Sequence, residues 1–363
     1  MSLTDKIAEI EEEIANTKYN KATQHHVGKL KAKLAQLREE VVTSSSGPKG
    51  SGYGVRKAGD ATVALVGLPS VGKSTLLNCL TDADSETGSY AFTTLDVVPG
   101  VLKYRDANIQ ILDLPGLIEG AARGAGRGKE VLSVIRSADL IVHVIDAVEP
   151  APHVILKELF DSGLRLNSRP PNGSISKTGI GGIEVISTVS QEVEEDAIKS
   201  VVREYGIVNA QVVLREKIDL DDLVDILAKT RVYSPSFDVI TKVDMVNKDQ
   251  LKEVRKKCTN KKIIEVAAPT GKGIEKLKKQ IYNSLEFISI FMKPQGEKAD
   301  LEEPMVVRRG TSIAEICQRL HRDFVRKFRY SQVWGPSAKF PGQTVGLNHE
   351  VKDQDIVSII THR

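Results

Sequence analysis

The fold is decided by one stretch of the sequence, Gly67-Leu68-Pro69-Ser70-Val71-Gly72-Lys73-Ser74-Thr75. It matches the pattern G-x-x-x-x-G-K-[ST] at every position. The apolar residues 61–66 before it predict a short buried strand, and residues 75–80 after it predict the first turns of a helix. A strand, this loop and a helix in that order are the context of a phosphate-binding loop. The stretch therefore predicts an α/β domain that binds a polyphosphate.

The residue types of this loop suit a chain of phosphates. Gly67 and Gly72 allow the backbone to curl, so that successive N–H groups point inward at the phosphates. Lys73 is expected to reach the β- and γ-phosphates as a catalytic residue, and the Ser74 hydroxyl is expected to bind Mg²⁺. The other expected cofactor-binding residues of the loop are Pro69, Ser70, Val71 and Thr75.

Two further segments follow in the order expected of switch loops. Thr93 and Thr94 are both candidates to place a hydroxyl on Mg²⁺ and an N–H group on the γ-phosphate, and we favour Thr94. Residues 108–112 predict a strand that ends at Asp113, which is expected to hold Mg²⁺ through water. The Gly116 N–H is expected to contact the γ-phosphate. The catalytic candidates are therefore Lys73, Thr94 and Gly116, and the metal candidates are Ser74, Thr94 and Asp113.

The stretch 238–244 predicts which base is bound. The Asp244 carboxylate is expected to accept hydrogen bonds from the N1–H and the N2 amine of guanine, because adenine offers neither donor in that place. The Lys242 stem is expected to flank the base. Thr241 stands where Asn is the usual residue.

A second base element is expected in residues 266–274. The Ala268 N–H is expected to contact guanine O6, and Ala267 stands where Ser is the usual residue. Pro269 completes this predicted element. With the phosphate loop, these features predict GTP or GDP as the cofactor, together with Mg²⁺.

The composition is that of a globular protein. The chain has 363 residues, of which 40% are hydrophobic and 27% charged, which is enough for two or three domains. No apolar run approaches the roughly 20 residues of a membrane span, and the polar N-terminus is unlike a signal peptide. The three cysteines are far apart, which argues against structural disulfides and a cysteine zinc site. We expect a cytoplasmic protein without a membrane partner.

The spacing of the motifs predicts several domains. Far more positions separate Asp146, at the end of another predicted strand, from Thr241 than one βα crossover needs. An inserted subdomain is therefore expected between them. The expected domains are 1–57 (helical hairpin and linker), 58–164 (first part of the GTP-binding or G domain), 165–230 (inserted α/β subdomain), 231–290 (second part of the G domain) and 291–363 (small β-grasp domain).

Apolar residues fall on one face of each helix in the predicted N-terminal hairpin. Those of the first, acidic helix are Ile7, Ile10 and Ile14, and those of the second, basic helix are Val27, Leu30, Leu34, Leu37 and Val41. We interpret this stripe as the seam of the hairpin and prefer that to a dimerisation zipper. The protein is accordingly expected to be a monomer.

Two basic segments, residues 18–38 and 308–339, predict an anionic macromolecule as partner. Ser312 and Glu315 form a capping box that is expected to open a helix running through Phe328. One face of that helix would carry Arg319, Arg322, Arg326 and Arg329, and the hairpin would add Lys29, Lys31 and Lys33. The alternatives are solvation, or pairing with acids of another domain such as those in residues 192–196.

Over nearly its whole length the chain resembles the developmentally regulated GTP-binding proteins, a branch of the Obg-like translation-factor GTPases. The resemblance is carried by the phosphate loop and by the stretches Phe92-Thr93-Thr94-Leu95, Asp113-Leu114-Pro115-Gly116-Leu117-Ile118-Glu119-Gly120-Ala121, Asn20-Lys21-Ala22-Thr23 and Val333-Trp334-Gly335. It implies an N-terminal helix-turn-helix, a G domain with an inserted α/β subdomain and a C-terminal TGS domain. It also implies association with ribosomes or RNA. The charge distribution points to the basic N-terminal helix and the C-terminal domain as the regions of contact.

The predicted function is Mg²⁺-dependent hydrolysis of GTP to GDP and phosphate, as a switch in translation or in ribosome-associated processes. A glutamine after D-x-x-G often positions the attacking water, and Leu117 cannot do this. Slow intrinsic hydrolysis is therefore expected, with the missing group supplied by an activating protein partner, a rearranged switch loop or a monovalent cation. The resemblance implies K⁺ as that cation, and Ser70, where many relatives carry Asn, would be a weaker ligand.

Two alternatives remain open at the level of sequence. One is a P-loop ATPase, against which Asp244 argues. The other is an RNA- or ribosome-binding module whose G domain senses nucleotide with little turnover. The complete set of Lys73, Ser74 and Asp113 argues against an inactive site.

Overall fold

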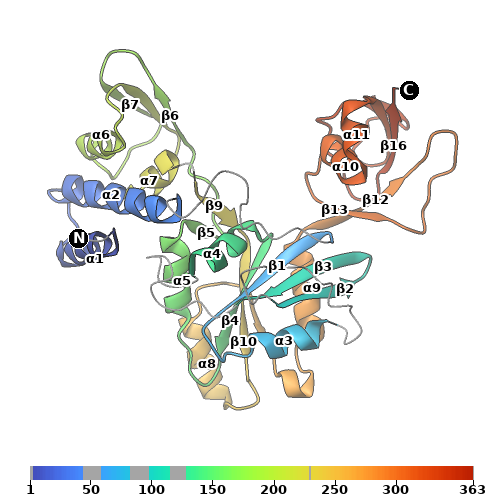
Figure 1. Cartoon of the computed structure of the whole chain (residues 1–363), viewed down its shortest axis with the longest axis horizontal. Coiled ribbons are helices and arrows are strands. Elements are labelled where there is room, and N and C mark those ends of the chain that lie inside the picture. Colours follow the sequence, from blue (N-terminus) through green and yellow to red (C-terminus); the bar gives the residue numbers. More distant parts are fainter. Residues whose placement is uncertain (1–2, 44–58, 82–97, 115–127, 229, 363) are drawn as a thin grey trace.

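The computed structural model of the chain describes residues 3–43, 59–81, 98–114, 128–228 and 230–362. Figure 1 shows a central sheet with helices on both faces. In this view the N-terminal helices and a small subdomain lie together at the upper left of the sheet, and the C-terminal domain lies at the upper right. Within the described residues, none of the helices combines the length and apolar character that a membrane crossing requires.

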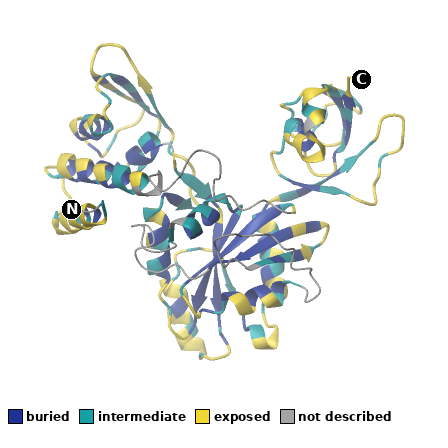
Figure 2. Cartoon of the chain, viewed as in Figure 1, coloured by how far each residue is buried: buried dark blue, intermediate teal, exposed yellow. Residues whose placement is uncertain are grey.

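The described part of the G domain is built on a six-stranded sheet in the order β11-β10-β4-β1-β3-β2. Its strands pair in parallel, apart from β2, which runs antiparallel to β3. Their bounds are β1 Ala61–Val66, β2 Val98–Tyr104, β3 Ala107–Asp113, β4 Leu140–Asp146, β10 Ser236–Thr241 and β11 Ile263–Glu265. The strands β1 and β4 are buried at every position, as expected of parallel strands covered on both faces. Figure 2 shows this sheet as the largest continuous buried region of the view.

The helices of the G domain divide between the two faces of this sheet. Residues of α3 and α9 share one apolar cluster, while residues of α4, α5 and α8 join clusters on the opposite face. Their bounds are α3 Lys73–Leu80, α4 Gly128–Ser137, α5 Pro152–Asp161, α8 Lys248–Lys257 and α9 Ile274–Ser284. Because the parallel strands all point the same way, the chain segments that follow them meet at one edge of the sheet, where open α/β sheets bind their ligands.

The N-terminal hairpin consists of α1 (Leu3–Asn16) and α2 (Gln24–Thr43). Its predicted seam is confirmed by a cluster that includes Ile7, Ile10 and Leu30. The inclusion of Val27 in this seam is wrong, because Val27 packs in the core of the inserted subdomain. The close approach needs Gly28, where an added Cβ would lie 2.8 Å from Val201 Cγ2.

The inserted subdomain holds a three-stranded sheet in the order β6-β8-β7 and packs against α2 through two helices. Its elements are β6 Gly173–Lys177, β7 Ile183–Ser187, α6 Glu195–Glu204, β8 Ala210–Leu214 and α7 Leu220–Ala228. A short parallel pair, β5 (Leu164–Leu166) with β9 (Val232–Ser234), connects it to the G domain. Lys31 of α2 bonds Asp221 of α7 at 2.6 Å, so one expected RNA-facing lysine is engaged within the protein.

The C-terminal domain is a five-stranded sheet in the order β13-β12-β16-β14-β15, with α10 and α11 against one face. Its elements are β12 Phe287–Met292, β13 Met305–Arg308, α10 Ile313–Leu320, α11 Arg322–Arg326, β14 Phe328–Trp334, β15 Gln343–Val345 and β16 Ile356–Thr361. Because β12 begins at Phe287, the sheet starts ahead of residue 291, where we expected this domain to begin. Both halves of the predicted capping box at Ser312 and Glu315 are present.

The prediction of one helix through Phe328 is wrong. The helix α10 ends at Leu320, and His321 is extended, with φ −168° and ψ 144°. Its Nδ1 accepts a hydrogen bond from the Asp323 N–H at 3.2 Å and so caps a new helix, α11. Residues from Phe328 onward pair with β16. The four arginines therefore do not form a single helical row.

Arg319, one of those four, connects two domains. Its guanidinium donates to the Val306 carbonyl at 2.6 Å and forms an ion pair with Asp60, beside β1. Arg308 adds an ion pair with Asp139 at 2.6 Å. The alternative of pairing with acids of another domain therefore holds for Arg319, although its partner belongs to the G domain rather than to residues 192–196.

Candidate nucleotide-binding site

The phosphate loop connects β1 to α3 in the predicted arrangement. Its backbone curls through two left-handed residues, Ser70 with φ 62° and Gly72 with φ 93°. At Gly67 an added Cβ would lie 2.6 Å from the Val144 carbonyl oxygen, so the loop can pass against β4 only without a side chain there. The loop therefore has the turns that bring successive N–H groups to one side.

Lys73 opens α3 and is buried beneath this loop. Its Nζ donates to the carbonyls of Gly67 and Leu68 at 3.0 and 2.8 Å. Burial lowers the pKa of the Lys73 ammonium, and the nearby Asp113 carboxylate opposes that shift. The expected phosphate-binding cation is thus held inside the loop by backbone contacts.

Ser74 and Asp113 come together from different elements. The Ser74 hydroxyl, in the first turn of α3, donates to the carboxylate of Asp113 at the end of β3. A hydroxyl and a carboxylate are hard oxygen donors, and Mg²⁺ commonly binds one or two such protein groups together with substrate phosphates. This donor set, beside the phosphate loop, fits Mg²⁺. The other expected contacts, Thr93, Thr94 and Gly116, lie outside the described residues.

The predicted base-reading stretch, residues 238–244, contacts the phosphate loop through two consecutive side chains. The Thr241 hydroxyl lies 2.7 Å from the Val71 carbonyl oxygen and 3.1 Å from that of Ile145. Lys242 Nζ donates to the Ser70 carbonyl at 3.0 Å. Thr241 therefore contributes a hydrogen-bonding group toward the loop from the position where Asn is usual. Asp244 is exposed in the following turn.

The second predicted base element, residues 266–274, follows β11. The Ala267 N–H donates to the Lys272 carbonyl at 3.0 Å, and the Ala267 methyl is buried. Ala268 and Pro269 begin a short 3₁₀ helix, Ala268–Thr270. A backbone bond of 3.4 Å from the Val243 N–H to the Val266 carbonyl connects the two base elements. The described residues of both elements thus lie at the same edge of the sheet as the phosphate loop.

A cavity of about 320 Å³ lies between the phosphate loop, the segment after β4 and the turn after β10. It is lined by Leu68, Pro69, Ser70, Val71, Asp146, Val148, Glu149, Lys242 and Met245. Asp146, Val148 and Glu149 were not among the site residues predicted from the sequence. A signal was available, because Asp146 ends a predicted buried strand, and the carboxyl ends of parallel strands are where ligands bind.

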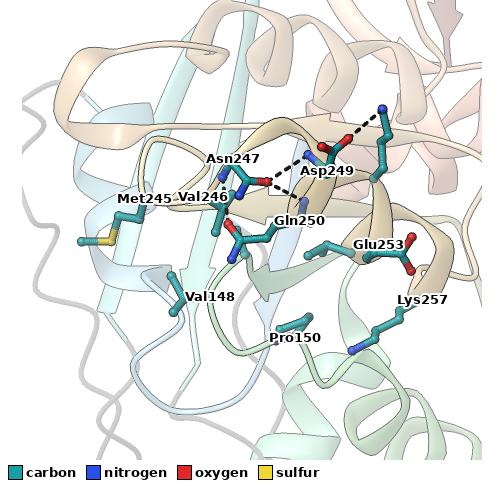
Figure 3. A pocket seen from close by; sticks show the side chains of 12 residues that line it. Val148, Pro150, Met245, Val246, Asn247, Asp249, Gln250, Glu253 and Lys257 are labelled. Atoms are coloured by element: carbon teal, nitrogen blue, oxygen red, sulfur yellow. Dashed lines mark hydrogen bonds and ion pairs between the residues drawn. The ribbon is translucent and has the colours of Figure 1, made fainter.

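A second cavity, of about 540 Å³, adjoins the first and shares Val148 and Met245 with it (Figure 3). The side chain of Asn247 accepts hydrogen bonds from the N–H groups of Asp249 and Gln250, at 3.0 and 2.9 Å, and caps α8. The cap fixes the C-terminal end of the turn that carries Lys242 and Asp244.

Comparison with known proteins agrees with this architecture. Residues 62–171 match a family described as 50S ribosome-binding GTPase, residues 180–287 match the C-terminal region of that domain, and residues 288–361 match the TGS domain. The fold and the matched domains together define a P-loop GTPase with a C-terminal TGS domain.

The chain is 50% identical over 368 residues to a GTP-binding protein of Methanocaldococcus jannaschii, covering 100% of this chain and 94% of that protein. It is 40% identical over 365 residues to developmentally-regulated GTP-binding protein 2 of Homo sapiens, covering 99% and 100%. It is 43% identical over 366 residues to GTP-binding protein 1 of Schizosaccharomyces pombe, again covering 99% and 100%. The chain belongs to the family of developmentally regulated GTP-binding proteins, as the resemblance implied.

Proposed function

We propose that this GTP-binding protein hydrolyses GTP to GDP and phosphate in a Mg²⁺-dependent reaction and acts as a switch. The observation that carries the proposal is the contact of Ser74 with Asp113 beside the buried Lys73. These three side chains supply two oxygen donors and one cation at the edge of the sheet where the phosphate loop opens. Phosphoryl transfer depends mainly on such positioning and charge stabilisation.

Each group has a defined role in this proposal. Ser74 and Asp113 would hold Mg²⁺, which, when bound, neutralises charge that develops on the β- and γ-phosphates. Lys73 would exchange its carbonyl contacts for the β- and γ-phosphate oxygens. Thr94 and Gly116 are proposed to contact the metal and the γ-phosphate, on the sequence argument alone.

Guanine is proposed to be read by Asp244, with the Lys242 stem along the base and the Ala268 N–H at O6. The contacts of Thr241 and Lys242 with the phosphate loop support this, since they hold the base elements next to the expected phosphates. Leu117 provides no hydrogen-bonding group for the attacking water. We therefore expect slow intrinsic turnover, accelerated by an activating partner or by K⁺.

The test is multiple-turnover phosphate release from GTP and, in parallel, from ATP, each with Mg²⁺ and with a chelator. The proposal predicts repeated turnover of GTP that requires Mg²⁺ and a strong preference for GTP. Preference for ATP would favour the ATPase alternative. Nucleotide binding without turnover, even with ribosomes present, would favour a nucleotide-sensing binding module.

We propose that the partner is the ribosome or an RNA, and that the protein is a cytoplasmic monomer. Support comes from basic side chains that are exposed in the structure. These are Lys29 and Lys33 of α2, Arg326 of α11 and Arg329 of β14. The matched family description, which names ribosome binding, agrees with this. Arg319 is excluded from this surface, because its guanidinium is engaged between domains.

A further inference from the structure

Asp146 lies at the junction of the phosphate loop and the base-reading stretch. It ends β4 and is paired in register with Thr241 of β10. Its Oδ1 accepts a hydrogen bond from the Val148 N–H at 2.8 Å. Its Oδ2 accepts one from Lys242 Nζ at 2.6 Å. Both carboxylate oxygens are therefore used, one to fix the side chain to its own loop and one to hold the lysine.

The held lysine is the one proposed to flank the base. Its backbone is left-handed, with φ 55°, which costs conformational energy in a residue with a side chain. In this conformation its ammonium reaches the Ser70 carbonyl at 3.0 Å, and Ser70 is left-handed too, with φ 62°. The contact between two such residues therefore needs support from their surroundings.

Asp146 provides that support through charge. The Asp146 side chain is 11% exposed and that of Lys242 is 35% exposed, so the pair is partly shielded from water. A charge-assisted hydrogen bond in such a place is stronger than one between neutral groups. Both residues also line the 320 Å³ cavity, so their contact lies in the cavity wall.

We infer that Asp146 is a positioning residue that sets the lifetime of bound guanine nucleotide. Its carboxylate holds the Lys242 ammonium on the Ser70 carbonyl and thereby keeps the base elements closed against the phosphate loop. The inference rests on the proposed placement of the base beside Lys242. Without Asp146, the base elements separate more easily from the phosphate loop and nucleotide leaves faster.

The test measures dissociation of a fluorescent GDP from the full-length protein by stopped flow, chased with excess GDP. Asp146→Asn keeps the shape of the side chain and removes its charge. It should speed dissociation about tenfold, in line with the loss of one charge-assisted hydrogen bond. Lys242→Met keeps the apolar stem and removes the ammonium, and it should speed dissociation by a similar factor.

The double variant separates positioning from a general structural effect. If Asp146 acts through Lys242, adding Asp146→Asn to Lys242→Met changes the rate less than twofold. The matched control is Glu195→Gln, which removes a carboxylate from an ion pair on α6 and should release nucleotide at the rate of the parent protein.

A further tenfold acceleration in the double variant, or dissociation at the parent rate in both single variants, would overturn the inference. Lys242→Met removes the other partner of the Asp146–Lys242 ion pair, so this variant still tests the inference if Asp146→Asn folds poorly. Absence of saturable GDP binding in the parent protein would instead refute the proposed site.

Discussion

At the scale of single residues, the site depends on a few side chains whose polar groups are held by backbone carbonyls. The Lys73 ammonium donates to two carbonyls of its own loop, and the Thr241 hydroxyl, at the end of β10, donates to the Val71 carbonyl of that loop. The sequence could predict these residues because each belongs to a short local motif, residues 67–75 for Lys73 and residues 238–244 for Thr241. It could not predict the role of Asp146, because that role depends on the register between β4 and β10, which are far apart in sequence.

Lys73→Ala should abolish detectable GTP hydrolysis and weaken GTP binding about 10- to 100-fold. The reason is that the variant removes one charge-assisted interaction with phosphate from a loop built around it. Equilibrium binding of labelled GTP and phosphate release measure the two effects. If the variant hydrolysed GTP at the rate of the parent protein, the phosphate loop would have no part in the mechanism.

Asp244→Asn should shift preference from GTP toward xanthosine triphosphate, because the amide offers an N–H donor to the extra carbonyl of xanthine. Competition of the two nucleotides for the labelled-GDP site measures this shift. Lys252→Gln, a change in an exposed surface pair, serves as the control. If the variant keeps the parent's GTP preference, Asp244 does not read the base.

The Cys258 thiol should be slow to react with a disulfide reagent. Burial, with Asp238 nearby, raises the pKa of this thiol to about 12. At pH 8 the group is therefore almost entirely protonated, and the thiolate is the reactive form. In a variant with Cys79→Ser and Cys317→Ser, the rate should rise about tenfold per pH unit from 8 to 10. A rate that levels off near pH 9, as for an ordinary cysteine, would contradict this.

At the scale of helices and strands, apolar runs and one capping box predicted several of the elements. The strands β1, β3 and β4 were predicted from mainly apolar runs, and α10 is opened by its predicted capping box. The error came where α10 was extended to Phe328. Residues 322–326 do form helical turns, but β14 is stabilised by β16, a partner near the end of the chain. A local periodicity cannot show such a partner.

The helix α2 is predicted to depend on Arg38. Its guanidinium bonds Glu11 of α1 at 2.8 Å and Asp161 of α5 at 3.0 Å, with all three side chains mostly buried. Arg38→Ala leaves two shielded carboxylates without this cation, which should cost about 2 kcal/mol. Hydrogen exchange of α2 amides should then speed about thirtyfold. Lys256→Ala, in an exposed pair on α8, should change exchange less than twofold. Unchanged protection of α2 in Arg38→Ala would show that apolar packing alone holds the helix.

At the scale of the whole molecule, the hairpin and the inserted subdomain pack together through α2, while the C-terminal domain is docked by Arg308 and Arg319. These contacts leave cations exposed on two separate parts of the protein. Both parts are available to a large anionic partner, which is the arrangement expected of a protein that contacts RNA through more than one surface.

Changing Lys29, Lys33, Arg326 and Arg329 together to glutamine should weaken ribosome association and flatten its salt dependence. The reason is that fewer phosphates are neutralised, so fewer counterions are released on binding. Co-sedimentation with ribosomal subunits over a range of salt concentrations measures this. A control with Lys252 and Lys256 of α8 changed to glutamine should behave as the parent. Equal binding of variant and parent at low salt would rule out this surface, and intrinsic GTP hydrolysis should be unchanged in both.

The central claim is that Ser74 and Asp113 form a Mg²⁺ site for GTP hydrolysis. The most direct test is a Mg²⁺ titration of phosphate release from GTP, in the parent protein and in Asp113→Asn. We predict that the variant needs at least about tenfold more Mg²⁺ for half-maximal rate, because a charged oxygen donor becomes neutral. An identical Mg²⁺ midpoint in the two proteins would contradict it.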